Sequence, residues 1–317
     1  MATTTWVNWG ASGAMAAPHL SQKIYEDALP SMKFDQFAEV PTDFGPGKGD
    51  EYFYRIEQDL VGAPTTFAGV VLNELVNIPL DQWTHLRGSV DVYEVGRGSS
   101  YTKRAQILSA WDVDDRTRDK LKRHLQRILD DGAATAFTAT DIKYTPTAAA
   151  AGTFVQTGVA LVDAAHQLTA YHIREMVDYL QNTLRAEPYD DDGFYVMITT
   201  GAGGRAIYDD LEIERGYLEA MPKERVLYGE RGRYYRCRII ETNNTTLGTV
   251  GTANAAESVM FGKNAVLKPV VAQPIILAEE RDKGRFHDIA WWGLLGYGCT
   301  LDYSTHGMAS IIHVDSV

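Results

Sequence analysis

The feature that most constrains this chain is one long amphipathic segment, from Asp112 to Phe137. Its apolar side chains recur at spacings of three and four residues, which predicts a helix with one buried face. That face comprises Leu121, Leu125, Ile128, Leu129, Ala133 and Phe137. Asp112 is placed to cap the N-terminus, where acidic residues also favour the helix dipole. The opposite face is charged and carries Arg116, Arg118, Lys120, Lys122, Arg123, Arg127 and Asp130.

A long β-rich stretch, residues 50–108, precedes this helix and contains few side chains that suit catalysis. An enzyme usually distributes helices among its strands, because a pocket has to be walled on several sides. A long β excursion that leads into one isolated helix is typical of a subunit that reaches toward its neighbours. We therefore expect exposed strands that another subunit covers, since long free strands promote aggregation.

The amino-acid composition indicates which classes of molecule the protein is expected to bind and in which compartment it is found. The chain has 317 residues, with 30 Lys and Arg against 42 Asp and Glu, which gives a net charge of −12. A basic stripe for nucleic acid is missing, and no run approaches the ~18 apolar residues of a membrane helix. The two cysteines, Cys237 and Cys299, fit a reducing compartment as ordinary buried thiols. Residues 1–13 do not resemble a signal peptide, so we expect a protein of the cytosol or of something assembled there.

The first 48 residues are weakly patterned but contain many aromatic side chains, which a disordered tail would lack. An extended arm whose rings pack on a surface fits better, and the sequence leaves open whether that surface belongs to the same chain. The next segments, 51–57, 67–79 and 83–95, have strand-like patterns, and 96–100 is expected to be a turn. The candidate contact residues of the arm, strands and helix are Trp6, Trp9, Phe34, Phe37, Tyr52, Tyr54, Trp83, Arg87, Arg116 and Arg127.

An Ala-rich segment, 145–152, is the expected connector between domains. A compact α/β unit is predicted after it, with a helix over 169–184, a buried strand over 194–199 and a helix near 205–214. Further strands are expected at 234–241, 258–261, 266–271, 288–302 and 309–314.

One motif could suggest an enzyme. Gly201-Ala-Gly-Gly-Arg-Ala206 matches the dinucleotide-binding pattern, after an apolar strand and before a helix. That fold also requires an acidic residue about 20 positions later, at the end of a second strand. Residues 217–224 contain Pro222 and have no strand pattern, so a plain turn is the favoured interpretation. No other catalytic, metal or cofactor motif is present, and we expect no enzyme activity and no cofactor.

In their order along the chain, these features resemble the major capsid proteins of tailed phages with the Hong Kong 97-like fold. The resemblance rests on Val92-Tyr-Glu-Val-Gly96, the helix Asp112–Phe137, Ser258-Val-Met-Phe-Gly-Lys-Asn-Ala265 and the ending 306–316. The stretch from Phe261 to Ala265 is similar to podovirus-type members. The expected fold class is α+β, with an N-terminal arm, an extended β-loop, a peripheral domain built on a spine helix and an α/β axial domain.

The resemblance implies a division of the chain into an arm (1–48), an extended loop (49–90), a peripheral domain (91–160 and 286–317, with the spine helix 112–137) and an axial domain (161–285). It implies a homo-oligomer of hexamers and pentamers in an icosahedral head that encloses DNA without sequence-specific binding. No fused scaffolding domain fits before residue 45, so a separate scaffolding protein is expected, together with a portal protein and possible decoration proteins. The expected location is the virion, assembled in the host cytoplasm.

Two alternatives remain open at this point. The same fold would serve an encapsulin-like nanocompartment shell, and an α/β enzyme could use Gly201–Ala206 for a nucleotide. The resemblance also bears on covalent cross-linking, because some members use a lysine in the extended loop. This chain has no lysine between Gly49 and Thr102, so we expect no such cross-link.

Overall fold

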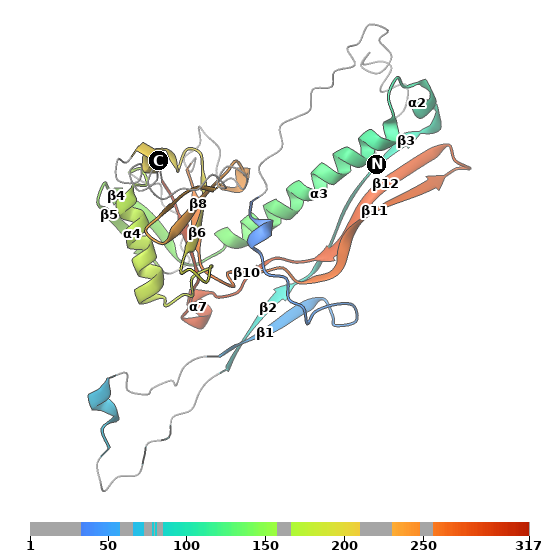
Figure 1. Ribbon diagram of the computed structural model, residues 1–317. Helices are drawn as coiled ribbons and strands as arrows, with labels where there is room; N and C mark the ends of the chain where they lie inside the picture. Colours follow the sequence, from blue (N-terminus) through green and yellow to red (C-terminus); the bar gives the residue numbers. More distant parts are fainter. Residues whose placement is uncertain are drawn as a thin grey trace.

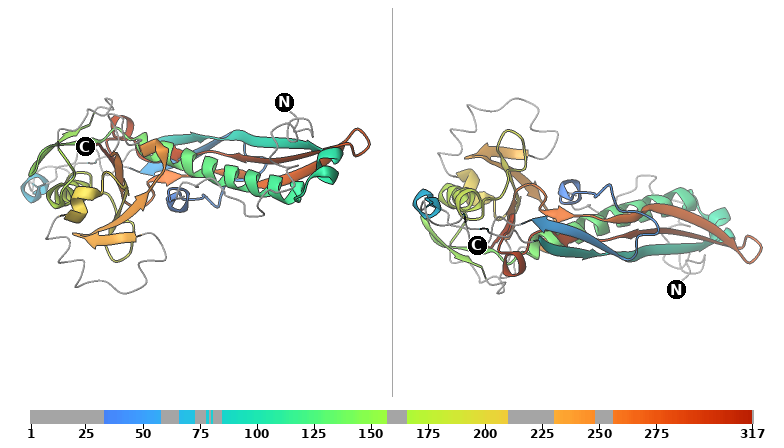
Figure 2. Two further views of the ribbon diagram at one scale, coloured as in Figure 1. Left: turned by 90° about the horizontal axis from the view of Figure 1, so that it is seen from above. Right: turned by 90° about the horizontal axis from the view of Figure 1, so that it is seen from below.

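The computed structural model describes residues 33–57, 66–72, 78, 80, 85–156, 166–209, 230–247 and 256–316 (Figure 1). Three parts are visible in Figures 1 and 2: a compact body, a long flat extension and a hairpin that projects from their junction. The helices are α2 (Lys103–Leu108), α3 (Val113–Thr138), α4 (Ala170–Asp178), α5 (Arg205–Asp209) and α7 (Tyr303–His306). Shorter turns are η1 (Asp35–Phe37), η2 (Phe67–Val70), η3 (Tyr179–Thr183) and η5 (Thr245–Leu247).

The body is built on a seven-stranded mixed sheet in the order β5-β4-β14-β9-β6-β8-β7. Its strands are β4 (Lys143–Ala148), β5 (Ala151–Val155), β6 (Tyr195–Thr200), β7 (Glu230–Tyr234), β8 (Cys237–Thr242), β9 (Ser258–Phe261) and β14 (Ile311–Val314). The central strands β6, β9 and β14 are buried along their whole length and are mostly apolar, as expected of strands that are covered on both faces. Alternate residues of β6 therefore enter different cores: Tyr195 and Met197 enter one, and Val196 and Ile198 the other.

Helix α4 covers one face of this sheet. Thr169 caps it in a capping box with His172, and its apolar stripe includes Ile173 and Met176, both 0% exposed. The other face is covered by the C-terminal part of α3, where Phe137 packs with its ring centroid 4.5 Å from that of Phe261. The strands of the body are thus fixed by two helices that are distant in sequence.

The flat extension is a three-stranded antiparallel sheet in the order β11-β12-β3. Its strands are β3 (Tyr93–Thr102), β11 (Val270–Arg281) and β12 (Phe286–Leu295). One face packs against the N-terminal part of α3 through Leu121, Ile289 and Trp291. Helix α3 therefore contributes to the core of the extension and to the core of the body, as Figure 1 shows.

The predicted spine helix is confirmed, with Asp112 accepting hydrogen bonds from the amides of Asp114 and Asp115. Its faces need two corrections. Ile128 is 37% exposed although it was placed on the apolar face. Asp130 was placed on the charged face and is only 1% exposed, because the arm and a loop of the body cover it.

The projecting hairpin pairs β1 (Glu51–Glu57) with β2 (His85–Asp91). The strand predicted over 51–57 is confirmed, whereas the strand predicted over 83–95 is divided at Val92 between β2 and the start of β3, which belongs to another sheet. The segment after Thr66 was expected to be extended, but residues 67–70 form the turn η2. A small pair, β10 (Val266–Leu267) with β13 (Gly298–Cys299), lies where the hairpin meets the extension.

Three further expectations are wrong. Residues 96–100 are part of β3 rather than a turn, and 145–152 belongs to the β4–β5 hairpin rather than to a connector. The segment 234–241 is divided between β7 and β8 by a turn in which Tyr235 and Arg236 have positive φ. Strands β4, β5 and β14, which lie within the ranges 91–160 and 286–317, pair in the seven-stranded sheet of the body.

Candidate assembly surfaces

The inner face of the β1–β2 hairpin holds the projection on its own subunit. Tyr54 donates a hydrogen bond of 2.7 Å to the carbonyl oxygen of Thr300, and burial raises the pKa of this phenol to about 12. Its ring lies over Gly88, where an added Cβ would be 2.2 Å from the ring carbon Cζ. Tyr52 stacks beside Tyr54 and donates to Asp43. Both tyrosines, proposed above as contact residues, thus fix the root of the hairpin within the subunit.

The outer face of the hairpin carries an exposed pair of an arginine and an aromatic ring. The guanidinium carbon of Arg87 lies 3.5 Å from the ring centroid of Phe53, which is 45% exposed. Arg55 lies directly opposite Arg87 in the strand register, and like charges in this position destabilise an isolated hairpin. Of the predicted hairpin residues that the structure describes, Arg87 is therefore the one that is presented to the surroundings.

Beyond the hairpin, the loop presents apolar side chains to solvent. Val71, Leu72, Ile78 and Leu80 are 65%, 55%, 67% and 93% exposed. Contiguous exposed apolar side chains in a projecting element are typical of contact surfaces. Trp83, also proposed as a contact residue, lies outside the described residues, as do Trp6 and Trp9.

The end of the arm is anchored in the subunit itself. Phe34 is 0% exposed and packs with its ring centroid 5.7 Å from that of Phe137. Phe37 contacts Tyr189 and Phe261 edge to face. Phe34 was proposed as an interface residue, and the structure corrects this: its ring completes the core of its own chain.

A buried acid holds this anchor in place. Asp130 accepts hydrogen bonds from the backbone amides of Phe34 and Asp35 and, at 2.7 Å, from the side-chain amide of Asn244. Burial raises the pKa of Asp130, and these donors oppose that rise. Asp35 in turn accepts hydrogen bonds of 2.6 Å from Lys268 and from the hydroxyl of Tyr297. The arm is therefore joined to helix α3, to the loop after β8 and to the flat extension.

The charged face of α3 reaches the surface as predicted: Arg116 and Arg127 are exposed. The structure adds Arg97 of β3, which sequence reasoning placed in a turn. Arg97, Arg116 and Lys120 line a groove between α3 and β3 that no sequence spacing indicated.

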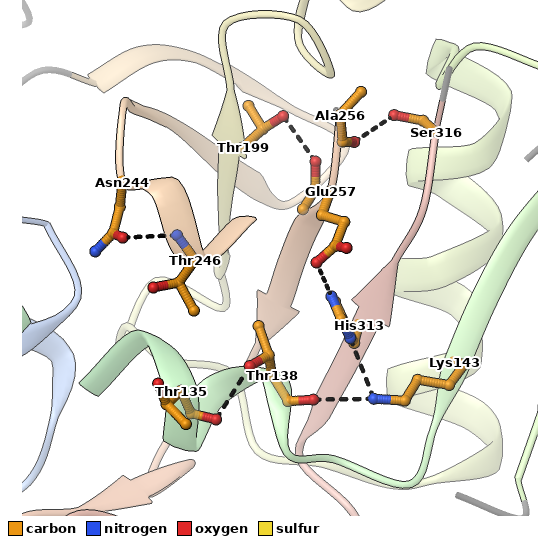
Figure 3. A network of polar contacts seen from close by, with 11 residues as sticks. Thr135, Thr138, Lys143, Thr199, Asn244, Thr246, Ala256, Glu257, His313 and Ser316 are labelled. Carbon is orange, nitrogen blue, oxygen red and sulfur yellow. Dashed lines mark hydrogen bonds and ion pairs between the residues drawn. The ribbon is translucent and has the colours of Figure 1, made fainter. Parts of the chain in front are cut away.

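Inside the body, a chain of polar contacts joins β14 to its neighbours (Figure 3). The side chain of His313 contacts Glu257 through Nε2 at 2.9 Å and the ammonium of Lys143 through Nδ1 at 3.1 Å. Lys143 also donates to the carbonyl oxygen of Thr138, at the end of α3. Because Lys143 can only donate, His313 accepts at Nδ1 and donates from Nε2, which describes a neutral imidazole. Burial lowers the pKa of His313, consistent with that form.

The Gly201–Ala206 motif is a packed turn. Its backbone folds back so that the amide of Gly203 donates to the hydroxyl of Thr200. A Cβ on Gly203 would lie 2.8 Å from the carbonyl oxygen of Ala256 and from the hydroxyl of Thr199. The second glycine thus allows close packing against the segment before β9, which explains it without a nucleotide.

Within the described ranges, no cluster of three His, Cys, Asp or Glu side chains could hold a metal ion. None of the described helices is long and apolar enough to cross a membrane.

Comparisons with known proteins identify the fold of this chain. No family model and no curated protein matches the chain. Among solved structures, it is similar to the capsid protein of cyanophage Pam1, with a TM-score of 0.70 and 16% identity over 94% of this chain and 96% of the other. It is also similar to the capsid of Ralstonia phage GP4, with a TM-score of 0.64 and 13% identity over 94% and 95% of the two chains. The capsid of Helicobacter pylori bacteriophage KHP30 matches with a TM-score of 0.66 and 13% identity over the same shares. The chain therefore has the α+β Hong Kong 97-like fold of phage capsid proteins.

Proposed function

We propose that this protein is the major capsid protein of a tailed bacteriophage, the shell subunit that self-assembles into an icosahedral head around DNA. The observation that carries this proposal is the structural match to phage capsid chains, which extends over nearly the whole length of this chain and of the matching chains. Proteins that share a fold at such low sequence identity can have different functions. The surfaces of this subunit must therefore also be suitable for contacts in a shell. The exposed apolar side chains of the projecting loop, the exposed Arg87–Phe53 pair of the hairpin and the cationic groove beside the spine helix do so.

The proposed subunit forms rings of five and six through heterologous contacts that close. Its domains are the arm, the extended loop (49–90), a peripheral domain containing α3 and the three-stranded sheet, and an axial domain containing the seven-stranded sheet. We propose a scaffolding protein in trans, a portal protein and possible decoration proteins as partners. The particle is assembled in the host cytoplasm, and the net charge of −12 suits a wall that encloses DNA without binding it tightly.

The two alternatives receive less support. An encapsulin-like shell would share the fold, but the matching structures reported above are phage capsids. An α/β enzyme would require a site at Gly201–Ala206, where the turn is packed against its own chain. A thermal-shift assay with nucleotides tests that alternative directly, because binding to the native state raises the melting temperature.

The decisive experiment is negative-stain electron microscopy of the purified protein, alone and after co-expression with the scaffolding protein encoded beside it. We expect closed, regular particles in at least the second preparation. Folded monomers in both preparations, with native circular dichroism, would contradict the proposed function.

A further inference from the structure

An open groove of about 470 Å³ lies between one flank of α3 and strand β3, which run side by side (Figure 1). Three exposed cations line it: Arg97 from β3, and Arg116 and Lys120, which are one helical turn apart on α3. None of the described residues that line the groove is acidic, although the chain has a net charge of −12. The groove is therefore a local concentration of positive charge on an acidic subunit.

The row of cations continues along α3 beyond the groove. Arg127 is exposed and lies about two helical turns after Lys120, which places both on the same stripe of the helix. The pKa of His124, which lines the groove, is lowered first by burial and then by repulsion from Arg97 and Arg127. Both guanidinium groups therefore act on one imidazole. At the rise of an α-helix, the row from Arg116 to Arg127 is about 17 Å long.

The order of residues along the chain conceals this row. Asp115 precedes Arg116 and Asp119 precedes Lys120, so the sequence shows alternating charge rather than a basic run. Neither aspartate lines the groove, and Arg97 comes from another element of the fold. Folding thus collects cations on a surface where the sequence shows no basic stripe.

The polar groups of the groove are suited to donate hydrogen bonds. Guanidinium and ammonium groups have no acceptor. His124 adds a donor, because its Nδ1 accepts a hydrogen bond of 3.2 Å from the indole of Trp291, and the proton of the neutral ring is then on Nε2. Among the described residues, no ion pair includes Arg97, Lys120 or Arg127. A row of such donors is suited to a polymer whose negative charges repeat along its length.

The proposed function supplies such a polymer, because a capsid encloses DNA. Duplex DNA carries one negative charge per about 1.7 Å of its axis, so a row of this length faces several phosphates. Arginine and lysine side chains bind phosphates without reading the base sequence. Only a few cations take part, and the net charge of −12 opposes tight binding. The expected contact is therefore weak and independent of sequence.

We infer that the row formed by Arg97, Arg116, Lys120 and Arg127 binds the phosphate backbone of the DNA inside the shell. The inference rests on the proposed shell function and deepens it, since it identifies the surface of the subunit that contacts the enclosed DNA.

Fluorescence anisotropy of the purified subunit with a labelled DNA duplex, over a series of low salt concentrations, tests the contact. Arg97→Gln with Lys120→Gln should weaken binding about tenfold or more. It should also reduce the slope of log affinity against log salt by about 2, since each phosphate contact contributes about 0.9. The matched control is Arg104→Gln with Lys122→Gln, two exposed cations outside the groove, which changes the net charge equally and should bind as the wild type does. Circular dichroism should be the same for all three proteins.

Lysine acetylation of intact particles tests the contact in the shell. In particles that contain DNA, Lys120 should react several-fold more slowly than in particles emptied of DNA. Lys122, an exposed lysine outside the groove, should react equally in both. Mass spectrometry of the digested subunits measures both rates.

Three results would overturn the inference: no DNA binding by the wild type at the lowest salt, equal loss of affinity in the groove variant and its control, or equal reactivity of Lys120 in filled and emptied particles. Polyglutamate tests another class of partner. If the groove substitutions weaken the binding of polyglutamate and leave DNA binding unchanged, the groove receives an acidic protein segment and the inference is wrong. All these results leave the proposed function standing while the wild type forms closed particles. If it forms none with its scaffold, the proposed function fails and the contact with enclosed DNA fails with it.

Discussion

The carboxylate of Asp130 accepts a hydrogen bond of 2.8 Å from the backbone amide of Phe34, although 96 positions separate the two residues. The bond is buried at both ends and joins the arm to the spine helix. The bond anchors the described part of the arm, which begins at residue 33.

The first prediction concerns this anchor. Asp130→Ala removes the acceptor for Phe34 and Asn244, and we expect a loss of about 1–3 kcal/mol in unfolding free energy for each buried donor left unpaired. Urea denaturation measures the loss. Asp119→Ala, an exposed acid of the same helix, is the control and should change the free energy little. Equal losses from both variants would contradict the anchoring role.

The second prediction separates the arm from its anchor. Deletion of residues 1–32 should leave soluble, folded subunits, whereas deletion of 1–40 removes Phe34 from the core and should leave insoluble protein. Soluble yield and circular dichroism report the fold, and electron microscopy then reports assembly. If the shorter deletion still forms regular particles with the scaffold, the first 32 residues are not needed for closure.

The third prediction compares the faces of α3. Leu121→Ala should destabilise the subunit by about 2–5 kcal/mol, because its side chain is buried against the three-stranded sheet. Leu125→Ala should cost less, since Leu125 is only half-buried. Arg127→Glu should change the unfolding free energy by about 1 kcal/mol or less, as surface charges do. Equal losses at Leu121 and Arg127 would mean that the buried face is assigned wrongly.

The fourth prediction concerns pH. Because burial lowers the pKa of His313, the neutral imidazole between Glu257 and Lys143 stabilises the fold. This contribution is complete above the unfolded-state pKa of about 6.5 and is lost as the pH falls. Unfolding free energy should therefore decrease from about pH 7 to pH 5, and less steeply in His313→Gln. Parallel pH profiles for the two proteins would exclude His313 as the source.

The fifth prediction follows from the missing lysine. With none between Gly49 and Thr102, particles boiled in denaturant should run as monomers of 35.1 kDa. A ladder of covalent multimers under reducing conditions would show another cross-linking chemistry.

The sequence predicted those elements whose signals are local. Helix α3 has its cap at Asp112 and a regular apolar stripe, and the strands 51–57 and 258–261 have their full pattern within a few residues. Gly96 and Gly98 misled the prediction, because glycines usually mark turns. Here they allow close approach of β12: a Cβ on Gly96 would lie 2.8 Å from the carbonyl oxygen of Trp291.

Features that depend on contacts distant in sequence could not be predicted. Asp130 has the spacing of a solvent-facing residue, and only the packed arm and the Asn244 loop make it a buried acceptor. The groove beside Lys120 likewise requires Arg97 from another element. Phe34 was predicted to be an interface residue because it lies in an arm that is rich in aromatic side chains. A single sequence does not distinguish a ring that packs on its own chain from one that packs on a neighbour.

The shared helix has a mechanical consequence. At about 1.5 Å per residue, α3 is a rod of about 39 Å whose two halves are set in different cores. A change in the angle between the flat extension and the body therefore requires α3 to bend or one of these two cores to repack. In the proposed shell, we expect each subunit to keep this angle, so that differences in curvature between five-fold and six-fold rings fall on the contacts between subunits.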